Sequence, residues 1–248
     1  MEITSHTHHI SQQFNIELDD IKTHLSEMGG MAERQVNDAI TAMIEVDIEK
    51  AEQVVRGDRK VNSMEVSIDE ECARILAKRQ PAAGDLRLVI TVTKAITDLE
   101  RIGDEAAKIA RQAMALGRDG AAPRGYVEMR HIGQHVSRML HDSLDAFARL
   151  DLDVALKVVQ TDKTVDMEYS TAMREMITYM IEDPRSITRV LNIMWSLRSL
   201  ERIGDHARNI AQYVVYLVMG EDVRHGSYEE IEEQVQQEQQ EQKNSDKS

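Results

Sequence analysis

The sequence predicts an all-α protein made of two tandem, pseudo-repeated, up-down three-helix bundles, with six long helices in total. Two observations indicate the helices: only 3 prolines and 12 glycines interrupt 248 residues, and apolar residues recur at helical spacing without alternating in period two. A third observation indicates the tandem arrangement, because segments of the two halves align with each other. With 42% hydrophobic residues, a chain of this length can bury a core in one large domain or in two smaller ones.

The internal duplication consists of two blocks. "NDAITAMIEVDIEKAEQVVRGDRKVN" from Asn37 aligns without a gap on "HDSLDAFARLDLDVALKVVQTDKTVD" from His141, at an offset of 104 residues. "DLERIGDEAAKIA" from Asp98 aligns on "SLERIGDHARNIA" from Ser199, at an offset of 101. The difference of three residues is best placed where "KRQPAAGDLR" faces "EDPRSITR" in the alignment. Each of these segments contains a proline turn, and a length change in a turn leaves helix packing undisturbed.

Three helices are predicted in the first half. The first covers about residues 11–45, carries an apolar seam in steps of four and three, and contains a Gly-Gly pair that could bend it. The second covers about residues 48–78 and ends before Pro81, whose ring cannot continue a helix. The third starts near Asp85, a plausible N-cap, and ends near residue 116 before the turn-rich "GRDGAAPRG". The seam of the first helix consists of Phe14, Leu18, Ile21, Leu25 and Met28.

The second half repeats this plan with helices at about residues 126–149, 153–182 and 184–219. The C-terminal segment after about residue 228 contains too little apolar surface to fold alone. The expected organisation is a flexible N-terminus (1–10), a first bundle (11–117), a linker (118–125), a second bundle (126–220) and a polar tail (221–248).

Charge and composition exclude several classes of function. A net charge of -14 repels nucleic acid and anionic membrane surfaces. The apolar stretch Tyr213–Met219 is far shorter than the roughly 20 residues that span a bilayer, and "MEITSHTHHISQQ" lacks the features of a signal peptide. The single cysteine, Cys72, excludes an internal disulfide, and we expect it to be buried by packing. We therefore expect a cytoplasmic protein that binds no nucleic acid and meets a membrane only through partners.

The pentapeptide "ERIGD" occurs twice, at residues 100–104 and 201–205. On a helical wheel of about 100° per residue, the apolar residues of each helix fall in one arc, and the carboxylates project from the opposite side, away from the core. The four carboxylates are Glu100, Asp104, Glu201 and Asp205. Two like charges at i and i+4 destabilise a helix by roughly 0.2 to 0.5 kcal/mol. A nearby cation is therefore expected at each copy.

Two interpretations of that cation remain open. Neighbouring bases could supply it on a solvated face, namely Arg101, Lys108 and Arg111 in the first copy and Arg202 and Arg208 in the second. Alternatively, each carboxylate pair could bind a metal ion, because oxygen ligands suit Mg²⁺, Ca²⁺, Mn²⁺ or iron.

Two further features accompany the pentapeptide. Gly103 and Gly204 each lie inside a helix, which costs about 1 kcal/mol relative to alanine, and close approach of a helix or a ligand would explain either. A polar face on the second helix could contact a neighbouring helix, the simpler explanation, or add ligands. This face consists of Asp58, Asn62, Glu65 and Asp69, with Asp162, Asp166, Tyr169 and Met173 at the equivalent positions.

Both ERIGD segments, together with "MGGMAERQVNDAITAM" and "AKRQPAAGDLRLV", resemble the PhoU family of phosphate-uptake regulators over residues 10–225, in order. The resemblance implies a non-enzymatic cytoplasmic regulator of two three-helix bundles. It implies partners in the ATPase subunit of a phosphate-specific ABC transporter and in a sensor histidine kinase, and it implies a homodimer. By the family's E(D)xxxD motif it also implies that Glu100, Asp104, Glu201 and Asp205 bind divalent metal or iron ions. The copies differ at Asp98 against Ser199 and at Glu105 against His206, so their sites need not bind equally.

Two other functions are considered. A helical di-metal oxidase needs two inward-facing Glu-x-x-His pairs, and the sequence offers one, Glu128 with His131. A metal-free helical adaptor would use the acidic faces only to dock basic surfaces of partners. The clustered His6, His8 and His9 are interpreted as a mobile N-terminal segment, with metal scavenging as the alternative.

Overall fold

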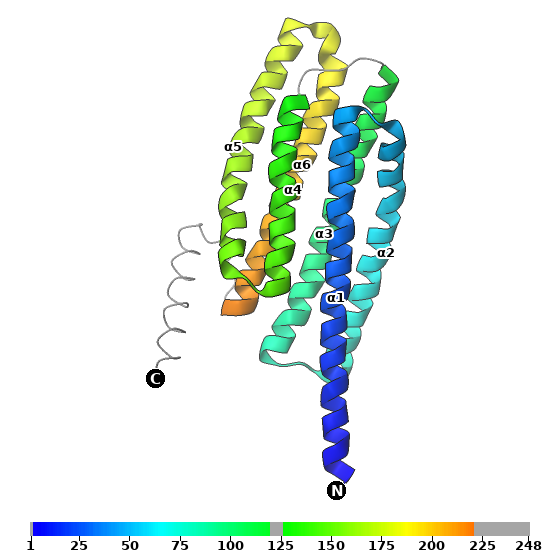
Figure 1. Ribbon diagram of the computed structural model, residues 1–248, viewed down its shortest axis with the longest axis vertical. Helices are drawn as coiled ribbons and strands as arrows, with labels where there is room; N and C mark the ends of the chain where they lie inside the picture. Colours follow the sequence, from blue (N-terminus) through cyan, green and yellow to red (C-terminus); the bar gives the residue numbers. More distant parts are fainter. Residues whose placement is uncertain (1, 120–125, 221–248) are drawn as a thin grey trace.

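The structure is a computed structural model that describes residues 2–119 and 126–220, with side chains from residue 12 onward. Its elements are long helices arranged as two up-down bundles (Figure 1), and the described residues include no strand. The predicted fold class is therefore confirmed. The elements are α1 (Glu2–Glu45), α2 (Ile48–Arg79), α3 (Ala83–Asp119), α4 (Tyr126–Arg149), α5 (Leu152–Glu182), the short 3₁₀ helix η1 (Pro184–Ser186) and α6 (Ile187–Met219).

Three helix starts differ from the prediction. α6 begins at Ile187 and not at Pro184, because residues 184–186 form the separate 3₁₀ helix η1. α1 begins at Glu2 and not near residue 11, because no proline or glycine precedes Gly29 to interrupt it. α3 begins at Ala83, so Asp85 lies in its first turn and does not cap it. The expected polar tail at 221–248 and most of the expected linker lie outside the described residues.

The duplication extends to the turns between paired helices. Val46 and Leu150 occupy equivalent positions and both have positive φ, 56° and 55°. The next residue in each half, Asp47 or Asp151, caps the following helix by accepting a hydrogen bond at 3.0 Å from the backbone N–H three residues on. An aspartate N-cap satisfies one of the backbone donors that the first turn leaves free. Equivalent sequence therefore gives the same turn twice.

The core of each bundle lies around one central helix, α3 or α6. α3 packs against α1 and α2, α6 packs against α4 and α5, and the two central helices pack along each other. The predicted apolar arcs of both central helices are buried, apart from Leu88 and Val218 at their ends, which are partly buried. Cys72 is buried in the core of the first bundle.

A second contact between the bundles is made by α1 and α4. A Cβ on Gly29 would lie 2.6 Å from Leu144 Cδ2, and a Cβ on Gly133 would lie 3.1 Å from Ile40 Cγ2. Gly29 is equivalent to Gly133 and Ile40 to Leu144 at the offset of 104, so the two contacts exchange when the halves are exchanged. The bundles are thus related by an approximate two-fold axis. The role of Gly29 is close helix approach, and α1 continues through it unbroken.

Within the described ranges, no helix combines the length and the apolar character needed to cross a bilayer.

Candidate metal centre

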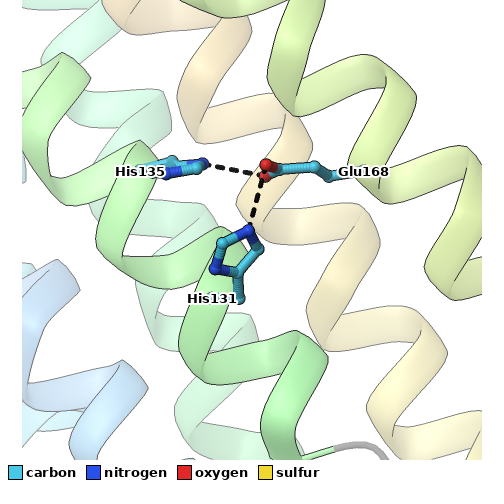
Figure 2. A group of neighbouring side chains, drawn as sticks. All are labelled: His131, His135 and Glu168. Carbon is cyan, nitrogen blue, oxygen red and sulfur yellow. Dashed lines mark hydrogen bonds and ion pairs between the residues drawn. The ribbon is translucent and has the colours of Figure 1, made fainter.

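The single Glu-x-x-His pair lies outside the bundle cores. His131 is on the outer side of α4, exposed, and it faces Glu168 of α5 (Figure 2). Glu128 is partly buried in the same groove between α4 and α5. A di-metal oxidase centre needs inward-facing ligands from four helices, and this geometry does not provide them.

The first pair of repeated carboxylates lies between α3 and α2. Glu100 and Asp104 are half-buried, and Asp58 and Glu65 of α2 are close enough to affect the ionisation of Glu100. We call these four residues the first acidic patch. The polar face of α2 therefore does face the repeated carboxylates. As the helical wheel predicted, Glu100 and Asp104 lie on the side of α3 opposite its apolar face. They are nevertheless only partly exposed to solvent, because α2 covers them.

The first acidic patch lacks a paired base. Burial raises the pKa of Glu100, and repulsion from Asp104 raises it further. Burial also raises the pKa of Glu65, with a hydrogen bond from Thr97 acting in the opposite direction. Among the described residues, neither Glu100 nor Asp104 forms a hydrogen bond or an ion pair through its side chain. Arg101 attracts Glu100 only from an exposed position. The patch therefore gathers negative charge, and among the described residues no base is paired with Glu100 or Asp104.

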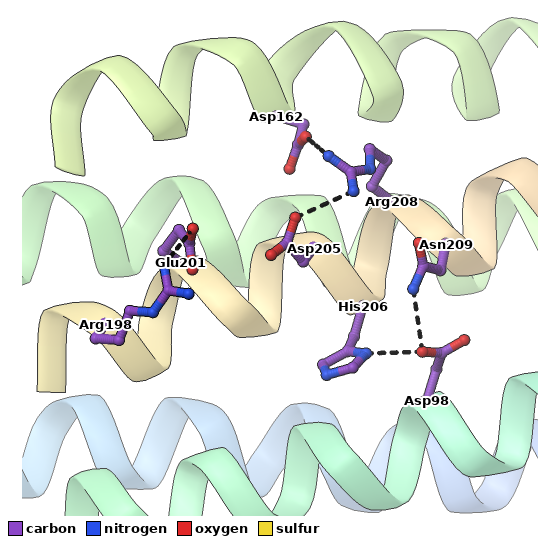
Figure 3. A network of polar contacts seen from close by, with 8 residues as sticks. All are labelled: Asp98, Asp162, Arg198, Glu201, Asp205, His206, Arg208 and Asn209. Carbon is purple, nitrogen blue, oxygen red and sulfur yellow. Dashed lines mark hydrogen bonds and ion pairs between the residues drawn. The ribbon is translucent and has the colours of Figure 1, made fainter. Parts of the chain in front are cut away.

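The second pair of repeated carboxylates lies between α6 and α5 (Figure 3). Glu201 and Asp205 face Asp162 and Asp166 of α5. We call these four residues the second acidic patch. Burial raises the pKa values of Asp162 and Glu201. The side chains of these two residues are only 5% and 13% exposed.

Two arginines neutralise the second acidic patch. Arg208 forms ion pairs with Asp162 and, at 3.1 Å, with Asp205. Arg198 Nη1 donates a hydrogen bond to Glu201 Oε1 at 2.7 Å. The predicted compensation by Arg208 is confirmed.

The first acidic patch has no equivalent of these arginines. At the offset of 101, Arg198 and Arg208 correspond to Thr97 and Ala107. The difference between Ala107 and Arg208 lies within the aligned ERIGD blocks, and the difference between Thr97 and Arg198 lies one residue before them. The two patches share their carboxylates and differ in their bases.

Two other predicted bases pair with Glu105, within α3 for Lys108 and across to α3 from α6 for Arg202. Arg202 and Lys108 both pair with Glu105, at 2.8 and 2.9 Å. The side chain of Glu105 is only 3% exposed. The assignment of these two bases to the repeated carboxylates was therefore wrong.

The differences between the copies at Asp98 and His206 also belong to the contact between α3 and α6. His206 Nδ1 lies 2.7 Å from Asp98 Oδ1, and Asn209 Nδ2 donates to the same oxygen at 3.3 Å (Figure 3). The sequence suggested that these differences distinguish two metal sites. In the structure they join the two bundles and point away from the acidic patches.

The two helix-interior glycines have different explanations. A Cβ on Gly103 would lie 3.2 Å from Asp58 Oδ1 and 3.3 Å from Gln35 Oε1, so α1 and α2 approach α3 closely here. Gln35 Nε2 occupies this crossing and donates to Asp58 Oδ1 at 3.1 Å. A Cβ on Gly204 would have no neighbour closer than 3.8 Å, and nothing in the structure explains glycine there.

The donor set of the patches suits a hard cation. Three of the buried oxygens that lack a hydrogen-bond partner in the described structure lie at or near the patches: Gln35 Oε1 and Asn62 Oδ1 near the first, and Glu201 Oε2 in the second. Within the described ranges, neither patch brings three ligand atoms within 4.8 Å of one another. An ion at Glu100 and Asp104 would thus keep several waters, as Mg²⁺ commonly does.

Comparison with known proteins identifies close relatives. The family model described as the PhoU domain matches residues 25–113 and 129–214. A phosphate-specific transport system accessory protein PhoU homolog of Pseudomonas aeruginosa is 62% identical over 93% of this chain and 95% of its own. The accessory protein PhoU of Escherichia coli K12 is 50% identical over 90% and 92%.

Solved structures show the same fold. The crystal structure of PhoU from Pseudomonas aeruginosa matches with a TM-score of 0.83 at 62% identity, covering 84% of this chain and all of that one. The phosphate transport system regulatory protein PhoU from Streptococcus pneumoniae matches with a TM-score of 0.78 at 30% identity, covering 85% and 99%.

Proposed function

Because the chain belongs to the PhoU family, we propose that it is a non-enzymatic accessory protein of a phosphate-specific transport system. The observation that carries this proposal is the high identity to proteins of that name over at least nine-tenths of both chains. In this role the protein keeps the phosphate-starvation response low when phosphate is plentiful and modulates phosphate uptake.

The finer proposal concerns its partners. The protein couples the ATPase subunit of the transporter to a phosphate-sensing histidine kinase, acts in the cytoplasm as a homodimer, and reaches the membrane only through these partners. Family membership supports this arrangement. A pull-down from cells grown on high phosphate, with the protein as bait, should recover both the ATPase and the kinase. Recovery of neither would contradict the coupling role.

The regulatory role is tested genetically. A deletion strain grown on abundant phosphate should express a phosphate-starvation reporter at a high level, and the wild-type gene should restore low expression. Low reporter expression in the deletion strain would refute the proposed function.

We further propose that the repeated carboxylates bind divalent metal or iron ions, with the first acidic patch the stronger site. Glu100 and Asp104 would supply the ligands there, and Glu201 and Asp205 would supply them in the second patch. The unneutralised carboxylates and the unpartnered Asn62 oxygen support a cation at the first patch. Arg208 already offsets the charge of the second, so an ion there must compete with it.

This difference gives a direct test with Mn²⁺ as the probe. The double variant Glu100→Gln/Asp104→Asn should lose most of the measured binding, whereas Glu201→Gln/Asp205→Asn should lose little. Thr97→Arg should weaken binding about tenfold, because it places a base one turn from Glu100, as Arg198 stands to Glu201, and a tenfold change needs only about 1.4 kcal/mol. Equal loss in the two double variants would refute the proposed ranking.

A metal-free adaptor is the second candidate, and the built-in neutralisation of the second acidic patch favours it there. In that case the variant with all four carboxylates amidated would retain the same metal content as wild type in elemental analysis. Reporter control by this variant would then report on docking alone.

A further inference from the structure

A cluster of two histidines and one glutamate lies on the outer side of the second bundle, away from both acidic patches. His131 and His135 are one turn apart on α4, and Glu168 reaches toward both from α5 (Figure 2). His131 Nε2 lies 3.1 Å from Glu168 Oε1, and His135 Nδ1 lies 2.9 Å from Glu168 Oε2. The two imidazole rings are 4.7 Å apart, centroid to centroid.

The spacing of these groups is that of a small metal site. One ligand atom from each residue lies within 4.8 Å of the other two, and no other such group of three occurs in the described part of the chain. In a tetrahedral zinc site with bonds of about 2.0 to 2.1 Å, ligand atoms are about 3.3 Å apart. The contacts of His131 Nε2 and His135 Nδ1 with the Glu168 carboxylate, at 3.1 and 2.9 Å, are already close to that spacing. Histidines at i and i+4 on one helix face are a known zinc-binding arrangement.

The surrounding groove favours a cation. Glu128 and Glu175 line the same groove of about 350 Å³ beside His131 and Glu168. Glu128 Oε2 is buried without a hydrogen-bond partner in the described structure. Burial and the adjacent Glu175 carboxyl raise the pKa of Glu128, as expected where carboxyl groups gather without a compensating charge.

The internal duplication shows that this cluster is not required by the scaffold. At the offset of 104, the three residues correspond to Glu27, Met31 and Met64 in the first bundle. Those residues cannot form an imidazole site. The cluster is therefore an addition to the second bundle and lies outside the repeated carboxylate motif.

The two glutamates beside the cluster support the same conclusion. Glu128 and Glu175 correspond to His24 and Glu71, and His24 Nδ1 lies 2.8 Å from Glu71 Oε2. The first bundle thus places a histidine against a glutamate where the second places two carboxyl groups. The second bundle carries the excess negative charge next to its histidine pair.

We propose that His131, His135 and Glu168 bind one Zn²⁺ ion, with water as the fourth ligand, and that the ion links α4 to α5. Two imidazoles and a carboxylate are a ligand set that zinc prefers over Mg²⁺ or Ca²⁺. The partial exposure of the histidines leaves the fourth position open to solvent or to a partner's side chain.

The test compares full-length variants in a background in which His6, His8 and His9 are changed to glutamine, to remove the other histidine group. Zn²⁺ is titrated by calorimetry, and four-coordinate Co²⁺ is followed by its visible absorption. The parent should bind one more Zn²⁺ per chain than His131→Gln/His135→Gln, and Glu168→Gln should weaken binding at least about tenfold. His141→Gln is the matched control, because His141 is also an α4 histidine paired with a glutamate, at 3.0 Å from Glu33, and it should change nothing.

Unchanged Zn²⁺ stoichiometry and Co²⁺ absorption in His131→Gln/His135→Gln would overturn the proposal. A variant that combines Glu100→Gln, Asp104→Asn, Glu201→Gln and Asp205→Asn distinguishes this site from the acidic patches. It should keep the Co²⁺ absorption even if it loses Mn²⁺ binding, and loss of that absorption would also overturn the proposal. Metal-free unfolding curves that match the parent show that each variant is folded.

Discussion

Replacing Arg208 by methionine should destabilise the protein strongly, because it leaves a buried carboxylate without its partner. Removing one member of a buried ion pair costs about 3 to 5 kcal/mol. Asp162 is 5% exposed, but Arg208 is 32% exposed, so solvent offsets part of this loss and we expect roughly 2 to 3 kcal/mol. Methionine preserves most of the side-chain length and limits the packing loss. For a protein of this size the melting temperature should fall by roughly 5 to 10 °C.

The pH dependence of this loss identifies its cause. Burial already holds the folded-state pKa of Asp162 above its usual value, and Arg208 opposes that rise. Without Arg208 the pKa rises further, so the ionised carboxylate is most costly at neutral pH. As the pH falls through the raised pKa, the carboxyl takes up a proton and the difference from wild type shrinks.

The measurement is urea unfolding of wild type and Arg208→Met at several pH values between 5 and 8. Arg198→Met is the control, because Arg198 is 56% exposed and exposed pairs contribute about 1 kcal/mol or less. A loss that stays constant over this pH range would show that packing, and not charge, causes it. Mn²⁺ should also stabilise Arg208→Met more than wild type, because Asp162 and Asp205 in the second acidic patch then lack their base.

Two further substitutions test the contacts between helices. Gly29→Ala should cost roughly 1 to 2 kcal/mol, because its Cβ would lie 2.6 Å from Leu144 and overpacking outweighs the gain in helix propensity. Gly57→Ala, with no atom within 4 Å of its Cβ, should instead stabilise by up to about 1 kcal/mol; the same sign for both in urea unfolding would refute the crowding argument. Arg79→Ala should lower the melting temperature near neutral pH, because Arg79 makes two 2.8 Å hydrogen bonds to Glu17 and lowers the pKa of that carboxyl. Stability from this pair is present above the ordinary glutamate pKa of 4.5 and is lost as the pH falls through the lowered value, so an equal effect at low pH would contradict it.

The helices could be predicted well because their signals are local. Apolar periodicity, proline turns and the duplicated capping aspartates lie within a few residues of the structure they determine. The start of α1 was missed because "SHTHHISQQ" carries no apolar stripe, although nothing in it breaks a helix.

The candidate site was predicted only in part, because its surroundings come from distant segments. A helical wheel shows that Glu201 leaves the core of its own helix, but not that α5 covers it to 13% exposure. It cannot show that Asp98 faces His206 across 108 residues. The contrast between Thr97 and Arg198 was available in the sequence, and comparing the copies base by base would have found it.

The reciprocal contacts of Gly29 with Leu144 and of Gly133 with Ile40 have a wider consequence. They are what an isologous dimer of identical subunits would make, yet here one polypeptide supplies both sides. Identical subunits must carry every substitution twice, whereas two fused halves can each change alone. This protein keeps the symmetric crossing and breaks the symmetry in its charges. The second half pairs Arg198 and Arg208 with its carboxylates and carries the His131–His135 pair, and the described residues of the first half form no equivalent of either. Fusion thus allows a two-fold scaffold to hold two carboxylate clusters with different charged surroundings.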